Sequence, residues 1–213
     1  MRLEIVATIV LFSTLGVGCA TSQRAVIAPA FAAVVVDVAP PREATKLVYR
    51  APASRLHVHA SDLLNGDHSI VFGTFRGVAE LDASGHGRFR LNVDMQTLEA
   101  ENDFITGFAK YELLEVDTYP RSTLVARVEP IAGEPGVLWI SGNLELHGVK
   151  QGIQFRARYA KDGDGLRIHA VWLMSRTQFG MRAREADWII QDDLRITLDL
   201  RAAPERVTIE DLP

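Results

Sequence analysis

The stretch that decides the fold runs from Gly142 to Phe155 and reads Gly-Asn-Leu-Glu-Leu-His-Gly-Val-Lys-Gln-Gly-Ile-Gln-Phe. Leu144 and Leu146 point to one side of the chain and their polar neighbours point to the other, which is the period of a β-strand. Gly148 breaks this run, and residues 149–152 carry the chain round before the alternation resumes. A glycine at each end of the connection suits a backbone with positive φ. The stretch therefore predicts a β-hairpin.

The same period of two continues through most of the chain, from about residue 49 to residue 202. The clearest run is 87–95, in which Phe89, Leu91, Val93 and Met95 share one face and arginine, asparagine and aspartate share the other. Turn sequences rich in Gly, Asp and Pro separate the runs, for example at 82–85, 133–136 and 162–165. About eight strands with one apolar face each are most simply arranged as an antiparallel barrel, because closure removes the sheet edges. We therefore predict an all-β protein.

The interior of such a barrel is either filled by its own side chains or large enough for one ligand. The predicted inward positions mix large apolar residues with small ones, such as Gly77, Ala79, Ala126, Ala157 and Ala170. Small residues at many inward positions favour a cavity. The alternative is that they only relieve packing where strands bend strongly.

One segment, 97–119, breaks the period of two. Its apolar spacing fits one or two short amphipathic helices across a barrel mouth, with Asn102 or Asp103 as the N-cap. Phe104 and Phe108, four residues apart, would share one helix face and cover the cavity.

The N-terminus reads as an export signal. An apolar run from Ile5 to Val17 is too short to cross a bilayer comfortably and ends just before Cys19, the single cysteine of the chain. We predict a signal peptide over 1–19, with Cys19 as the acylated first residue of the mature protein. The alternative is a plain secretory signal with an incidental thiol.

The rest of the chain divides simply. We predict a flexible tether over 20–46, a barrel domain over 47–203 and an acidic tail over 204–213. The chain has 213 residues, of which 47% are hydrophobic, enough for one sizeable core. The net charge of −4 argues against nucleic-acid binding, which needs a basic surface. There is no Gly-rich phosphate loop, CxxC or HExxH, so the sequence implies no cofactor.

Five short motifs, in order, resemble those of the YceI-like family. Residues 146–150 (Leu-His-Gly-Val-Lys) resemble its Leu-His-Gly-Val-Thr-Lys hairpin, and 175–181 (Ser-Arg-Thr-Gln-Phe-Gly-Met) resemble its Arg-Ser-Asp-Phe-Gly-Ile stretch. Residues 75–77, 117–124 and 67–68 resemble its Phe-x-Gly, Tyr-Pro and Asp-His segments. The resemblance covers about residues 49–202. It differs at Gln178, where the family has Asp.

The resemblance implies a lipocalin-like barrel that binds a long-chain apolar ligand, such as an isoprenoid or a fatty-acid-like chain, in the bacterial cell envelope on the periplasmic side. Acylated Cys19 would then attach it to the membrane; otherwise the protein is secreted or periplasmic. The predicted cavity wall consists of inward apolar residues of the barrel and its cover: Phe75, Phe89, Leu91, Phe104, Phe108, Leu144, Leu146, Phe155, Trp172 and Phe179.

Polar candidates are few. Arg176 could meet an anionic head group with its planar guanidinium, or form a salt bridge to Asp103 or Asp117. His57 and His59 share a strand face and could chelate a metal, the basis of an alternative metal-dependent enzyme.

We predict instead that the protein is not an enzyme and holds no metal. Asp192 and Asp193 are adjacent, so in a strand they face opposite ways, which is poor geometry for acid–base catalysis. A further alternative is a structural or partner-binding envelope protein whose barrel is filled.

Overall fold

The computed structural model describes residues 40–41, 44–64, 66–163 and 165–204. The predicted signal peptide with Cys19, nearly all of the tether and the acidic tail from residue 205 lie outside the described residues. The first strand begins at Thr45, so the last two residues assigned to the tether belong to the barrel.

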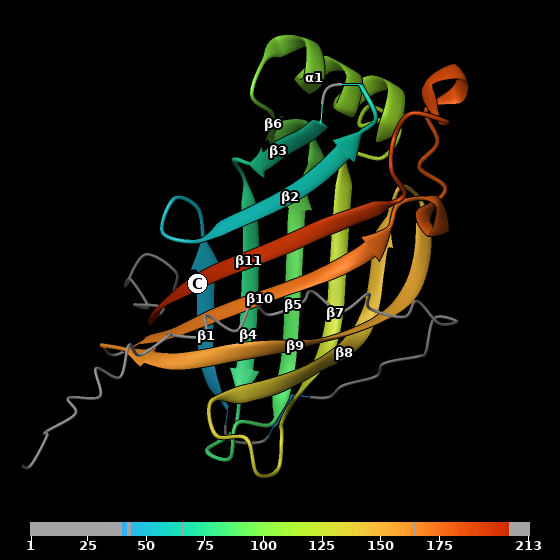
Figure 1. Ribbon diagram of the computed structural model, residues 1–213. Helices are drawn as coiled ribbons and strands as arrows, with labels where there is room; N and C mark the ends of the chain where they lie inside the picture. Colours follow the sequence, from blue (N-terminus) through green and yellow to red (C-terminus); the bar gives the residue numbers. More distant parts are fainter. Residues whose placement is uncertain (1–39, 42–43, 65, 164, 205–213) are drawn as a thin grey trace, which may run out of the picture.

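The prediction of an antiparallel barrel of about eight strands is confirmed. The strands of the closed barrel are β1 (Thr45–Arg50), β4 (Phe75–Leu81), β5 (Gly87–Asp94), β7 (Arg121–Pro130), β8 (Val137–Leu146), β9 (Val149–Asp162), β10 (Gly165–Ser175) and β11 (Asp193–Pro204). They pair antiparallel in this order, and β11 pairs with β1 to close the ring (Figure 1). Closure leaves no edge on this part of the sheet.

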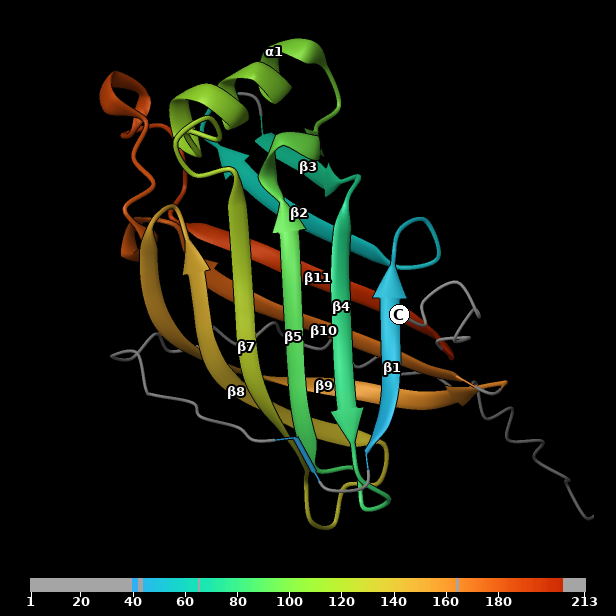
Figure 2. The same ribbon diagram turned by 180° about the vertical axis from the view of Figure 1, so that it is seen from behind.

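Three further strands extend the sheet along one side of the barrel. They are β2 (Arg55–Asp62), β3 (Gly66–Phe72) and the short β6 (Leu98–Glu99). β2 pairs with the first half of β11, β3 pairs with β2, and β6 pairs with β3. This extension forms one wall of the upper half of the molecule in Figures 1 and 2.

The hairpin around Gly148 is confirmed, with a tighter turn than predicted. Leu146 pairs directly with Val149, so the connection is only His147 and Gly148, whose φ angles are 51° and 70°. Positive φ at both central residues is the turn that matches the twist of antiparallel strands. Gly152 is not in the turn but pairs with Asn143 inside the hairpin.

The segment that breaks the period of two forms a cap over one end of the barrel. It contains α1 (Asp103–Gly107) and a wider helical turn, η2 (Phe108–Leu113). Asn102 caps α1 by accepting a hydrogen bond from the Ile105 amide at 2.9 Å. Figure 2 shows the cap above the ends of β5 and β7.

Short single-turn helices complete the described part: η1 (Met95–Thr97), η3 (Thr177–Phe179) and η4 (Arg184–Ala186). The last two lie in the segment that joins β10 to β11, at the same end as the cap (Figure 1). None of the helices in the described ranges is long and apolar enough to cross a membrane.

Candidate ligand-binding site

An apolar cavity of about 100 Å³ lies in the half of the barrel beneath the cap. Its wall is almost entirely hydrocarbon and comes from the barrel strands, from the β2–β3–β6 extension and from the cap: Leu56, Val58, Ala60, Ile70, Phe72, Leu91, Val93, Met95, Leu98, Leu113, Leu114, Ser122, Leu124, Leu144, Leu146, Ile153, Trp172, Met174, Met181, Leu194 and Ile196. Ser122 is a polar side chain in this wall, and its hydroxyl is satisfied by donating a hydrogen bond to the Glu145 carbonyl oxygen at 2.9 Å.

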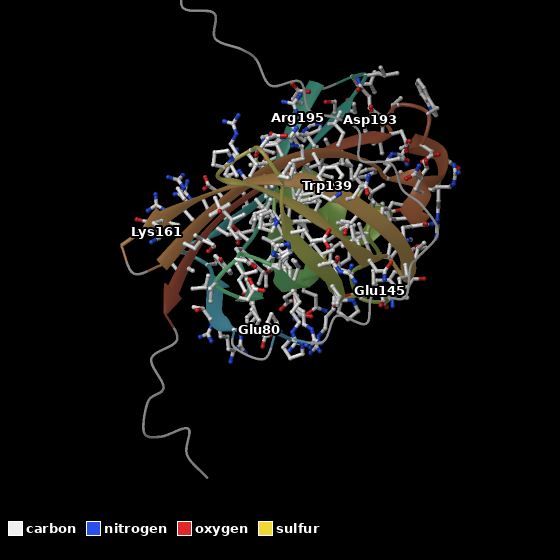
Figure 3. The ribbon with its side chains drawn as sticks, turned by 90° about the horizontal axis from the view of Figure 1, so that it is seen from below. Glu80, Trp139, Glu145, Lys161, Asp193 and Arg195 are labelled. Carbon is white, nitrogen blue, oxygen red and sulfur yellow. The ribbon has the colours of Figure 1, made fainter. Side chains whose placement is uncertain are left out.

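The opposite half of the barrel is filled by its own side chains. The space left there is only about 10 Å³, at the lower limit of what one water molecule needs. Its lining includes Phe89, Phe155 and Ala170. Figure 3 views the barrel from this end, with Glu80 and Lys161 at its periphery.

Four of the predicted wall residues line the cavity: Leu91, Leu144, Leu146 and Trp172. Phe89 and Phe155 point into the filled half instead. Phe75 and Phe179 are buried in the core away from the cavity wall. The residues are therefore inward, as the alternation predicted, but the alternation cannot tell which half of the barrel they occupy.

The predicted cover by Phe104 and Phe108 needs a correction. Phe104 is 76% exposed and points away from the cavity, while Phe108 packs partly buried against the core outside the cavity wall. The two are one helical turn apart, since the Phe108 amide donates to the Phe104 and Ile105 carbonyls, but neither side chain reaches the cavity wall. Leu113 and Leu114, at the end of η2, form the cover instead.

Trp172 forms part of the cavity wall and is held there by stacking. Its ring lies parallel to that of Phe155, with centroids 4.1 Å apart and an interplanar angle of 5°. Its indole nitrogen is buried and has no hydrogen-bond partner among the described residues. A buried donor without a partner is unfavourable in a folded protein.

Arg176 does not face the cavity. Its side chain is 2% exposed, and all three guanidinium nitrogens are occupied. Nε donates to the Gln191 carbonyl at 3.1 Å, Nη1 to the Met181 carbonyl at 2.7 Å and to Asp187 at 2.6 Å, and Nη2 to the Asp187 and Ile190 carbonyls at 3.1 and 2.9 Å.

The head-group prediction for Arg176 is therefore replaced by a structural role. The salt-bridge alternative holds, but with Asp187 as the partner rather than Asp103 or Asp117. The hydrogen bond from Arg176 holds the pKa of Asp187 below its usual value. This arginine organises the segment between β10 and β11 beside the cavity.

His68 joins the cap to the β2–β3 hairpin. Its Nε2 lies 2.8 Å from Asp62 Oδ2, and its Nδ1 contacts the Glu101 carboxylate just before α1. Burial lowers the pKa of His68, but the hydrogen bonds to Glu101 and Asp62 outweigh burial and leave it raised. The hydrogen bond from His68 in turn lowers the pKa of Glu101.

The other histidines form no centre. The rings of His57 and His59 lie 6.4 Å apart on the outer side of β2. No group of three or more His, Cys, Asp or Glu side chains in the described ranges is arranged to hold a metal ion.

Three of the sequence motifs meet at the capped end. The His147 ring packs against Tyr119, with centroids 4.5 Å apart, and Gly148 lies directly below the same tyrosine. Gln151 donates to the Gln178 carbonyl at 3.3 Å, which ties the β8–β9 hairpin to η3. These motifs therefore hold the β8–β9 hairpin against Tyr119 and η3 at the capped end.

The comparisons with known proteins agree with this architecture. The YceI-like domain family matches residues 50–202, and the chain belongs to this family. Comparison with curated protein sequences gives no match.

Three solved structures show the same fold at low sequence identity. Burkholderia cenocepacia BcnA is 19% identical, with a TM-score of 0.63 over 70% of this chain and 96% of that one. A polyisoprenoid binding domain from Saccharophagus degradans, implicated in plant cell wall breakdown, is 17% identical, with a TM-score of 0.62 over 76% and 99%. The Campylobacter jejuni YceI protein is 17% identical, with a TM-score of 0.55 over 64% and 84%.

Proposed function

We propose that this barrel binds one long-chain apolar ligand, isoprenoid or fatty-acid-like, and carries or sequesters it in the bacterial cell envelope. The observation that carries the proposal is the apolar cavity beneath the cap, whose wall is almost wholly hydrocarbon. Burial of each CH₂ group there is worth about 0.8 kcal/mol. The Saccharophagus degradans relative described as a polyisoprenoid binding domain supports the choice of ligand class.

The size of the cavity sets a condition on this function. About 100 Å³ is comparable to cavities that accept one small ring, so a long chain needs more room than the described arrangement provides. Within the cap, α1 is the part best suited to move because it has no buried residue, whereas η2, whose end covers the cavity, buries Ala109 and Leu113. Few buried apolar contacts mark a segment of low local stability.

A series of prenyl alcohols of increasing length tests the proposal. Isothermal titration of the purified chain should show a single site, with affinity rising roughly fourfold per added CH₂ until the available wall is covered. An affinity independent of chain length, or no saturable site at all, would leave the filled-barrel structural role as the better account.

We further propose that the protein reaches the envelope as a lipoprotein through Cys19. This rests on the apolar run before the cysteine and on its being the single cysteine of the chain. Intact mass of the membrane-fraction protein should show acyl groups and no residue before Cys19. A soluble mature form with a different first residue would contradict it.

A further inference from the structure

Large apolar side chains project from one end of the molecule. Among the described residues, six large hydrophobic side chains are exposed, and five of them lie at the capped end: Leu63, Leu64, Phe104, Tyr111 and Trp188. We call these five the apolar rim. The sixth, Val171, is on β10 and is the least exposed, at 36%.

Backbone and side-chain contacts bring the segments of the apolar rim together. The Leu63 amide donates to the Ile189 carbonyl at 2.9 Å, so the β2–β3 turn lies beside the segment that bears Trp188. The contact of His68 with Glu101 ties β3 to the start of α1. Figures 1 and 2 both show the cap, the β2–β3 turn and the β10–β11 segment at this end.

The form of the apolar rim suits a lipid surface better than a protein partner. Its side chains come from the tips of three separate segments, and Phe104 and Trp188 are 76% and 75% exposed. A stable protein interface needs roughly 800 Å² per partner with its anchors clustered at the centre. A fluid lipid surface adapts to separate anchors, and Trp and Tyr are enriched at membrane interfaces.

The charged residues around the apolar rim indicate whether a neutral or an anionic lipid surface suits it better. In the described parts of 62–67, 99–115 and 182–188, acidic residues outnumber basic ones by nine to three: Asp62, Asp67, Glu99, Glu101, Asp103, Glu112, Glu115, Glu185 and Asp187 against Lys110, Arg182 and Arg184. This excess repels anionic lipid and would also repel the same end of a second copy.

We propose that the apolar rim docks the capped end of the barrel on a neutral, zwitterionic phospholipid bilayer, with the cap over the cavity facing the lipid. If a cavity ligand is transferred at this contact, that step rests on the proposed function above. Docking on the bilayer is independent of the proposed function, because it depends only on side chains outside the cavity wall.

The test uses the full chain and dioleoylphosphatidylcholine vesicles with or without bromine on the acyl chains, which quenches tryptophan only on contact. The chain has three tryptophans, and the difference between wild type and Trp188→Phe isolates the signal of Trp188. Binding of the chain to vesicles through its N-terminus alone would not bring Trp188 into contact with the brominated acyl chains. Quenching of Trp188 therefore reports docking of the capped end. We expect the brominated vesicles to quench Trp188.

The triple variant Leu63→Ser, Leu64→Ser, Phe104→Ser should need about tenfold or more lipid for the same quenching, since it removes three apolar anchors. Val171→Ser is the matched control and should behave as wild type. Replacing part of the neutral lipid by phosphatidylglycerol should weaken the quenching.

Three results would overturn the proposal. The first is an unquenched Trp188 on vesicles to which the chain is bound, and the second is equal quenching in the triple variant. The third is a dimer in sedimentation velocity that the triple variant abolishes while vesicles leave Trp188 unquenched, which would make the apolar rim a protein interface. Ligand titration of the same samples is separate, so a failure of docking is distinguishable from a failure of ligand binding.

Discussion

A pair of matched substitutions separates the open half of the barrel from the filled half. Ala60 lines the cavity beneath the cap, and Ala170 lines the filled half, and both are buried. Changing either to leucine adds the same three carbon atoms on the inner face of the sheet. Any difference between the variants therefore reports the space available in each half.

The structure sets the sign and size of the two effects. At Ala60 the cavity of about 100 Å³ can receive the new atoms, so burial of three carbons at about 0.8 kcal/mol each sets an upper limit of about 2 kcal/mol of added stability. At Ala170 only about 10 Å³ is free, so overpacking should cost about 1–3 kcal/mol. At about 2–4 °C per kcal/mol for a chain of this size, the melting temperatures should differ by roughly 10 °C.

Thermal unfolding followed by circular dichroism measures the difference, and titration with a prenyl alcohol measures binding to the same samples. Ala60→Leu should melt at or above the wild-type temperature and bind the alcohol more weakly. Equal destabilisation by both substitutions would refute the reasoning, because it would mean that the half beneath the cap is as tightly filled as the other.

Three other substitutions test the parts that hold the site. Arg176→Ala should lower the free energy of unfolding by about 3–5 kcal/mol in urea denaturation, because it leaves the buried partners of the guanidinium unpaired; a loss below about 1 kcal/mol would contradict the structural role. Gly148→Ala should destabilise more than Gly133→Ala in the same assay. Both glycines have a positive φ, so any side chain there costs about 1–2 kcal/mol of stability. Of the two, only Gly148 would also place the new Cβ against another residue, 2.6 Å from Tyr119. Equal losses of stability in the two variants would argue against this contact. His68→Gln should remove a pH-dependent part of the stability, measured as the gap to wild type in denaturation at a series of pH values.

The sign of the His68 effect follows from the two pKa shifts. The pKa of His68 is raised above 6.5 in the folded state, so its contribution is present below pH 6.5 and is lost as the pH rises through the folded pKa. The pKa of Glu101 is lowered below 4.5, so its contribution is present above pH 4.5 and is lost as the pH falls through the folded value. The gap between wild type and His68→Gln should therefore be widest between pH 4.5 and 6.5, and a gap that does not change with pH would rule out this coupling.

The barrel could be predicted from the sequence because each strand carries its own signal. The alternation in 87–95 places Phe89 and Leu91 on the inner face in the structure, as predicted. The position of a residue along the barrel axis depends on strand register, which is set by pairing between distant segments. This is why Phe89 and Phe155 were predicted for a cavity that lies in the other half.

The cap and the arginine cluster show two further limits. The spacing of four residues places Phe104 and Phe108 one helical turn apart, but it cannot tell which side of the cap faces the cavity, and Phe104 is 76% exposed in the structure. The partner of Arg176 is set by the fold of the segment before β11, so Asp187 could not be chosen over Asp103 or Asp117 from sequence spacing. By contrast, the hairpin at Gly148 depends on two adjacent residues and was predicted, although with a longer connection.

The most direct test of the central claim is native mass spectrometry of the purified chain, followed by solvent extraction and identification of what is released. We predict a complex of one chain with one apolar ligand for the wild type, and a marked loss of that species for Ala60→Leu, whose side chain occupies the cavity. Folded wild-type protein that releases no apolar molecule, or an equal amount bound to Ala60→Leu, would contradict the claim that the cavity beneath the cap is the binding site.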